Sequence, residues 1–258
     1  MRKLLTASVA VLAVFAAAAV AVAQSSVAPV VTVTASASPA KGGSKSKPVG
    51  ASTSIKFDVN PESNSTLAGV DYGLPSTLKI SGAGFSKCSA TTINNKGESA
   101  CPAKAKVGTG AATALLGPGK SAIQFAVNVY TNGTNGLVLA LKQTNGSVQV
   151  AFDAKYANSR LAFSIPSNVQ QPVPGLYSYV TSVTANLGPA KVTKTTTKKV
   201  KKKGKTKKVK VKKTYNLVSR TGCTGGTDAF DVKLTLAANP DPPAVNPATG
   251  STTSACSK

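Results

Sequence analysis

Hydrophobic and polar residues alternate along several short stretches of this chain. The clearest are 55–59, 123–129, 148–156 and 230–236, in which an aliphatic or aromatic residue occupies every second position. A period of two is typical of a β-strand with one buried face. No stretch carries a sustained 3.6-residue apolar stripe, so the pattern predicts an all-β protein.

Turn-forming residues separate the predicted strands. Asn-Gly pairs follow the strand at 123–129, and Asn145-Gly146 predicts a type I′ hairpin turn, because both residues tolerate positive φ. Residues 60–75 carry mostly turn chemistry, and one helical turn fits within 89–100. Further strands are expected at 30–34, 76–80 (and on towards Phe85), 109–116, 137–141, 161–165 and 177–187. Strands spaced at roughly 8–12 residues predict an antiparallel β-sandwich.

Four cysteines add covalent links to this fold. Cys88, Cys101, Cys223 and Cys256 permit three pairings. We favour Cys88–Cys101 and Cys223–Cys256, because the members of each pair are close in sequence with a strand or turn between them. The sequence therefore predicts two local disulfides.

The first 23 residues have the form of a secretory signal peptide. Met1-Arg2-Lys3 is basic, residues 4–22 are uncharged and apolar, and Ala21-Val22-Ala23 has the small-x-small form of a cleavage site. We expect cleavage before Gln24, the alternative being an uncleaved membrane anchor. Residues 24–258 then form a single β-sandwich domain, or two closely packed halves. The protein is expected to be secreted or extracytoplasmic and associated with the cell surface.

The net charge of +23 is concentrated in one segment. Thirteen lysines and no acidic residue lie between Lys191 and Lys213. Threonine and valine favour strands, and Lys203-Gly204-Lys205 marks a turn, so a protruding Lys-rich β-hairpin is predicted over 190–216. Its field would attract polyanions. The predicted polyanion-binding residues are Lys198, Lys199, Lys201, Lys202, Lys203, Lys205, Lys207, Lys208, Lys210 and Lys212.

Lysine lacks the bidentate geometry with which arginine reads bases, so binding by this hairpin would not depend on nucleic-acid sequence. The expected partners are anionic wall polymers, lipid headgroups or extracellular nucleic acid. The alternative is that the lysines only keep an exposed strand edge soluble.

Few residues could support catalysis. The chain has no histidine, which excludes Ser/His and Cys/His nucleophile pairs and histidine-based metal sites. Among the carboxylates only Asp228 and Asp231 are close in sequence. We predict that the protein is not an enzyme and has no cofactor, metal site or small-molecule substrate. The alternative function is a carbohydrate-binding module of the cell surface, with Tyr177 and Tyr179 on one face of a strand.

Three motifs together resemble a group of uncharacterised secreted all-β proteins of high-GC Gram-positive bacteria. They are the loop Ser38-Pro-Ala-Lys-Gly-Gly43, the segment Cys88 to Cys101-Pro-Ala-Lys-Ala-Lys-Val-Gly-Thr-Gly110, and the pair Cys223 and Cys256 enclosing an alternating strand. The group has no assigned activity, so the resemblance implies a fold and export only. The overall expectation is a secreted structural or interaction protein with a basic hairpin.

Overall fold

The computed structural model describes residues 27–117, 121–202, 205–237 and 247–257. The predicted signal peptide at 1–23 lies outside these residues. Strands make up 59% and helices 10% of the described part, and the fold is an antiparallel β-sandwich with a protruding Lys-rich β-hairpin and two local disulfides. The predicted fold class is confirmed.

The strands in chain order are β1 (Val31–Ser38), β2 (Val49–Val59), β3 (Leu67–Gly73), β4 (Leu78–Ile80), β5 (Lys106–Leu116), β6 (Ser121–Thr131), β7 (Gly136–Gln143), β8 (Gln149–Ala157), β9 (Arg160–Ser164), β10 (Ser178–Leu187), β11 (Lys191–Lys202), β12 (Lys205–Asn216), β13 (Val218–Arg220), β14 (Thr227–Leu236) and β15 (Ala248–Ala255). The helices are short: α1 (Ala90–Lys96), α2 (Ser167–Gln170) and the 3₁₀ turns η1 (Pro61–Ser63), η2 (Glu98–Ala100) and η3 (Ala103–Ala105).

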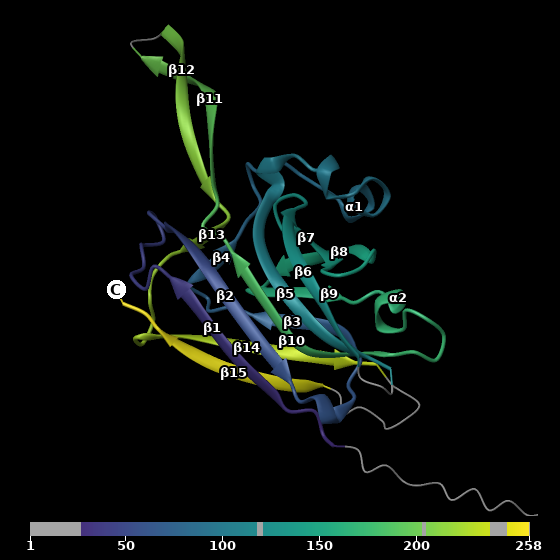
Figure 1. Cartoon of the computed structure of the whole chain (residues 1–258). Helices are drawn as coiled ribbons and strands as arrows, with labels where there is room; N and C mark the ends of the chain where they lie inside the picture. Colours follow the sequence, from purple (N-terminus) through teal and green to yellow (C-terminus); the bar gives the residue numbers. More distant parts are fainter. Residues whose placement is uncertain (1–26, 118–120, 203–204, 238–246, 258) are drawn as a thin grey trace, which may run out of the picture.

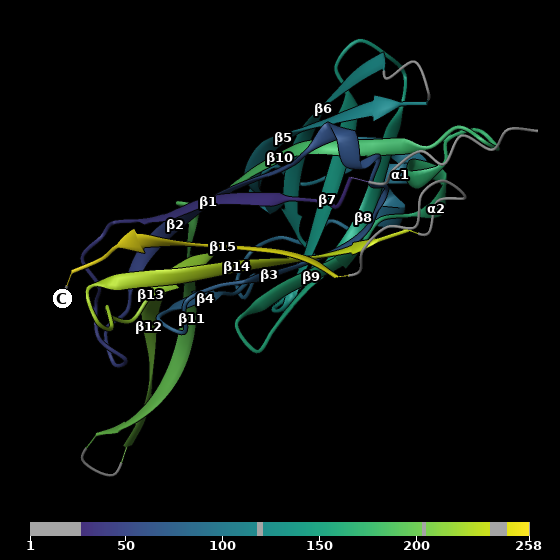
Figure 2. The same cartoon turned by 90° about the horizontal axis from the view of Figure 1, so that it is seen from below.

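One long antiparallel sheet forms the body of the protein. Its strand order is β15-β14-β3-β9-β8-β7-β6-β5-β10-β2-β13-β4, and β1 pairs with β2. The sheet curls until β1 lies against β15 (Figures 1 and 2). A Cβ at Gly250 of β15 would lie 2.6 Å from Val33 Cγ2 of β1, so a glycine permits this close approach. The concave face of the curled sheet encloses the core.

The alternation of the sequence places the core residues on this concave face. On β14, Phe230, Val232, Leu234 and Leu236 are all buried. The Phe230 ring stacks on Tyr72 of β3 with 6.2 Å between ring centroids. The two-residue alternation of the β14 sequence therefore corresponds to one buried face and one outer face of the strand, as predicted.

Two local predictions are wrong. Within 60–75, Leu67–Gly73 is the strand β3, which pairs with both β9 and β14. Ladder bonds on both sides outweigh the turn preference of its glycines. Asn145-Gly146 is also no type I′ turn, because neither residue has positive φ and the connection spans 144–148. Positive φ at two consecutive positions is found instead at Asn158-Ser159, between β8 and β9.

Both predicted disulfides are present. Cys88–Cys101 and Cys223–Cys256 have Cα–Cα distances of 5.4 and 5.7 Å. The segment enclosed by the first contains α1, whose Ser89 cap accepts a hydrogen bond from the Thr92 amide at 3.1 Å. The first bridge therefore closes a compact helical insertion between strands.

A buried ion pair joins three separate parts of the chain. Arg220 at the end of β13 pairs with Asp228 of β14, and both side chains are almost fully buried. Arg220 Nη1 also donates to the carbonyls of Pro39 and Ala40, each at 2.6 Å. Thr77 donates to the second Asp228 oxygen at 3.2 Å. This network holds the loop after β1, the start of β4 and the start of β14 together.

Candidate functional site

The lysine hairpin is a separate two-stranded sheet formed by β11 and β12. It projects from the body in both views (Figures 1 and 2). It follows directly from the sheet, since β10 ends at Leu187 and β11 begins at Lys191. Of the ten predicted binding lysines, Lys203 lies outside the described residues, and the other nine lie on β11 and β12. The prediction of a hairpin over this segment is confirmed.

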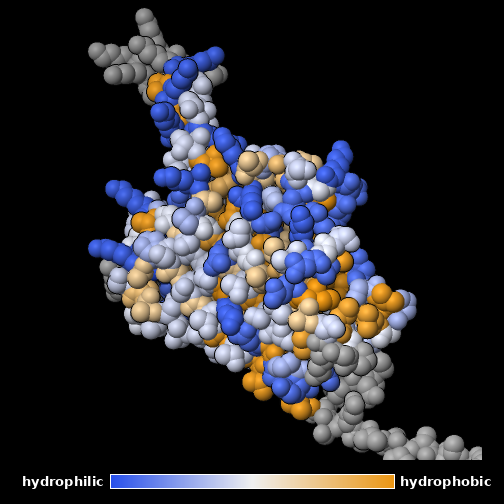
Figure 3. All heavy atoms as spheres, in the orientation of Figure 1, coloured by the Kyte–Doolittle hydropathy of each residue, from blue (hydrophilic) through white to orange (hydrophobic). Residues whose placement is uncertain are grey.

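The register places lysines directly opposite one another. Lys194 pairs with Lys213, Lys199 with Lys208, and Lys202 with Lys205. Lys208, Lys210 and Lys212 are exposed, as are Lys191, Lys194 and Lys213. None of the hairpin lysines whose side chains the structure describes (191, 194, 208, 210, 212 and 213) forms an ion pair. The hairpin therefore carries a dense, uncompensated positive charge away from the body, and its surface is mainly hydrophilic (Figure 3).

Of the hairpin side chains that the structure describes, those at the base pack against the core. Val192 and Tyr215 face each other in the register and pack as half-buried residues against the core cluster. Beyond them Thr193 and Thr214 share a hydrogen bond at 3.1 Å, and Lys213 Nζ lies 4.8 Å from the centroid of the Tyr215 ring. The chain then returns to the body at Leu217, which is fully buried. The lysine-bearing part of both strands is thus attached to the body at the base of the hairpin.

Of the two tyrosines of the carbohydrate-binding alternative, Tyr177 directly precedes β10 and Tyr179 is its second residue. Tyr177 and Tyr179 are both half-buried. Ser178 and Val180 line the interior of the sheet, so Tyr177 and Tyr179 belong to the outer face. Burial is the main cause that raises the pKa of Tyr179, and the neighbouring Tyr177 adds to it. Alternation along this segment therefore places both tyrosines on the outer side of the sheet.

The two carboxylates closest in sequence do not form a pair. Asp228 faces the interior and binds Arg220, whereas Asp231 lies on the outer face. Asp231 and Asp71 both bind Arg160, at 2.7 Å each. Hydrogen bonding to Asp231, and after it to Asp71, raises the pKa of Arg160 against the opposing effect of burial. Both acidic residues of β14 are thus engaged with arginines on opposite faces of one strand.

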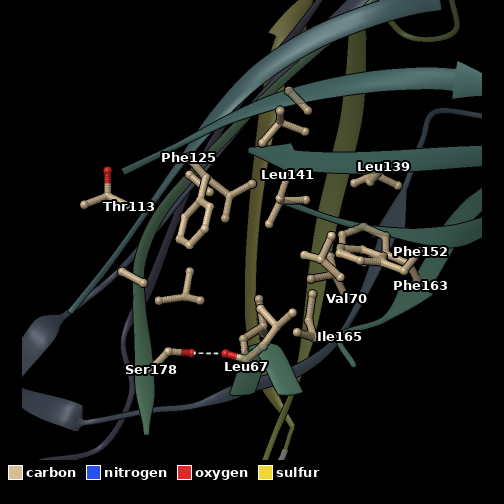
Figure 4. Close-up of a pocket in the computed structure, with 18 of the residues that line it drawn as sticks. Leu67, Val70, Thr113, Phe125, Leu139, Leu141, Phe152, Phe163, Ile165 and Ser178 are labelled. Carbon is tan, nitrogen blue, oxygen red and sulfur yellow. Dashed lines mark hydrogen bonds between the residues drawn. The ribbon is translucent and has the colours of Figure 1, made fainter. Parts of the chain in front are cut away.

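A cavity of about 330 Å³ runs along the concave face of the sheet. Figure 4 shows Phe125 and Leu141 on one side, with Val70, Phe152 and Phe163 across from them, pointing into the same space. The Phe152 and Phe163 rings tilt against each other with 5.7 Å between centroids. The walls of the cavity come from β2, β3, β5, β6, β7, β8, β9 and β10 and from α2. Sequence reasoning did not predict this cavity, because alternation identifies inner-face residues without showing whether they meet.

The cavity has a closed end and an open end. Thr53 and Tyr72 lie at the closed end, each 3% exposed. Asn168 and Pro172, which are exposed, line it at α2 and the segment that follows, near the start of β10. Val148 and Val173, close to this opening, are 48% and 54% exposed. The opening is therefore at the far end of β10 from the hairpin.

In the part of the chain that the structure covers, no helix has both the length and the apolar character needed to cross a membrane. Comparisons with protein-family models, with curated proteins and with solved structures found no match. The chain's own geometry is therefore the basis for its functional assignment.

Proposed function

We propose that this protein is a secreted interaction protein that binds polyanions, independently of their sequence, through the β11–β12 hairpin. The observation that carries the proposal is the projection of β11 and β12 from the body with lysines as their only charged residues. A flexible polyanion could contact both strands without meeting the body of the protein.

The energetics of the hairpin support a role outside folding. Like charges directly opposite each other in an antiparallel pair destabilise it, and three such lysine pairs occur here. Among the hairpin side chains that the structure describes beyond Val192 and Tyr215, none belongs to the core cluster that could offset this repulsion. A bound polyanion would remove the repulsion, so binding and ordering of the hairpin would reinforce each other.

The residue choice fits partners that present repeated anionic groups. Lysine is a compact point charge on a flexible stem, which suits phosphates and carboxylates of variable spacing. Anionic wall polymers, lipid headgroups and extracellular nucleic acid all have this property. Release of counterions would make the affinity strongly dependent on salt.

The test compares two variants with the same change in charge. In the first, five exposed hairpin lysines become glutamine: Lys194, Lys208, Lys210, Lys212 and Lys213. In the matched control, five exposed body lysines become glutamine: Lys41, Lys45, Lys104, Lys142 and Lys155. Binding to a random-sequence DNA duplex is measured over a range of salt concentrations.

For the unmodified protein, about five neutralised phosphates give a log–log salt slope near −4 to −5. The hairpin variant should bind more weakly and with a shallower slope, whereas the body variant should keep the slope of the unmodified protein. Homopolymer and random duplexes should bind alike. Equal losses in the two variants would mean that total charge alone drives binding, and the proposal would fail.

The carbohydrate-binding alternative is distinguished in the same experiment. Stacking of a sugar on Tyr177 and Tyr179 would depend little on salt, because it involves no ion release. A glycan array read at two salt concentrations therefore separates it from polyanion binding. Salt-independent glycan binding that Tyr179→Ala abolishes would replace the present proposal.

A further inference from the structure

We propose that the cavity inside the sheet binds an uncharged molecule with an elongated apolar body and a single hydroxyl or carbonyl group, which hydrogen-bonds to Tyr72. This inference is independent of the hairpin. It rests on the incomplete burial of the cavity walls, on their lack of charge, and on an unpaired hydroxyl at the closed end.

The inner-face residues near the opening are incompletely covered. On β6, Val127 and Val129 are buried, but Ile123 and Phe125, on the same face and nearer the opening, are only half-buried. Val180 and Val183 of β10 are half-buried in the same way. These side chains line the cavity, so filling it would remove their remaining apolar surface from water. The walls therefore match an apolar body lying along the strands.

The size of the cavity sets the size of that body. At roughly 30 Å³ per small group, the share of one water in the liquid, 330 Å³ holds about ten non-hydrogen atoms. A chain of nine carbons with one oxygen fits this volume, and a longer chain would extend through the opening. Hydrophobic surface gathers on the body at the end away from the hairpin, near α2 (Figure 3). An apolar chain leaving the cavity would meet this surface.

The lining excludes charged ligands. No lysine, arginine, aspartate or glutamate is among the described residues that line the cavity. The polar residues at the open end, Gln143, Gln149 and Asn168, are neutral amides. An ion would leave water without gaining a counter-charge, which is strongly unfavourable. An occupant that lies wholly inside the cavity must therefore be neutral.

The closed end presents a polar group that lacks a partner. Tyr72 is 3% exposed, and its hydroxyl makes no hydrogen bond within the described structure. Thr53 lies beside it and donates its own proton to the Ser36 carbonyl at 3.1 Å, so Thr53 cannot also donate to Tyr72. Burial raises the pKa of Tyr72, with Thr53 acting in the opposite direction, so the phenol stays protonated and can donate. Buried hydroxyls normally have a partner, and a ligand oxygen would supply it here.

Equilibrium dialysis of the intact protein against 1-nonanol, nonane and nonanoate tests the proposal directly. We expect saturable binding of 1-nonanol at one site, weaker binding of nonane, and the weakest binding of nonanoate at neutral pH. Tyr72→Phe should weaken 1-nonanol binding by about two- to tenfold, the range for one neutral hydrogen bond, and leave nonane unchanged. This variant removes only an unpaired hydroxyl, so the fold should persist.

A second pair of variants separates the cavity from general surface adsorption. Ala112 lines the cavity, and Ala112→Phe should abolish binding by filling it. Ala111 is its exposed neighbour on the opposite face of β5, and Ala111→Phe should bind as the unmodified protein does. Absence of saturable 1-nonanol binding, or equal affinity in the Tyr72→Phe variant, would overturn the proposal. Stronger 1-nonanol binding by the Ala111→Phe variant, which adds an aromatic ring to the surface, would also overturn it.

Discussion

Replacing Asp228 with asparagine should strongly destabilise the fold. The change keeps the shape of the side chain and its contact with Thr77 but removes the charge that pairs with Arg220. Arg220 would keep only the Pro39 and Ala40 carbonyls as partners while remaining fully buried. Burial already lowers the pKa of Arg220, which shows the direction of the desolvation cost.

The expected loss follows from the burial of both partners. Breaking a buried ion pair by removing one member typically costs about 3–5 kcal/mol. A domain of ordinary stability has about 5–15 kcal/mol in total, so the loss would be a large part of it. With a urea slope of about 2 kcal/mol per molar, the unfolding midpoint should fall by roughly 1.5 M or more.

Asp231 provides a matched control on the same strand. It is three residues away, carries the same charge and also binds an arginine, but its side chain is 43% exposed. Asp231→Asn should therefore cost only about 0–1 kcal/mol. Urea unfolding followed by circular dichroism, with both disulfides intact, measures the two variants under the same conditions.

Similar midpoints for the two variants would refute the reasoning, because burial would then not decide the cost of losing the charge. A third variant, with Arg220→Met and Asp228→Leu together, removes both charges at once. It should recover much of the stability lost in Asp228→Asn, since replacing a whole buried pair is often neutral. A double variant less stable than Asp228→Asn would show that hydrogen bonding to the loop after β1 matters more than charge.

Three further predictions concern the two disulfides, the contact between β1 and β15, and the hairpin. Removing the 223–256 disulfide should destabilise the protein by about 0.8 kcal/mol more than removing the 88–101 disulfide, because it closes a loop of 33 residues rather than 13. The measurement compares the urea unfolding midpoints of two variants, each with both cysteines of one disulfide replaced by serine. Gly250→Ala should cost about 1–3 kcal/mol by separating β1 from β15, whereas Gly222→Ala, which meets only one atom at 4.0 Å, should be tolerated. Deleting 191–213 and closing the gap with a short Gly-containing turn should leave the far-UV circular dichroism of a folded sheet; an unfolded product would mean that the hairpin supports the core.

The sequence by itself determined the features that depend on local chemistry. Strands such as β6 and β14 were predictable, because a strand with one buried face shows a two-residue alternation in its own sequence. The disulfide pairs were predictable because their members are close along the chain. The hairpin was predictable because threonine and valine favour strands and Lys203-Gly204-Lys205 favours a turn.

Tertiary structure alone decided the features that depend on distant partners. The segment that contains β3 is rich in turn-forming residues, yet hydrogen bonds to β9 and β14 on its two sides make β3 a central strand. β15 carries small polar residues and becomes a strand by pairing with β14, with Gly250 allowing it to meet β1. Local preference is weak compared with a full ladder of hydrogen bonds, so neither strand could be predicted from its own residues.

The cavity and the buried ion pair also depend on residues that are distant in the sequence. Arg220 and Asp228 are close in sequence, but their burial depends on Pro39, Ala40 and Thr77, which the fold brings from far along the chain. Tyr72 lines a cavity because the sheet curls, and its hydroxyl makes no hydrogen bond within the described structure. Alternation fixes which face a side chain occupies. The curvature and register of the whole sheet fix what lies opposite it.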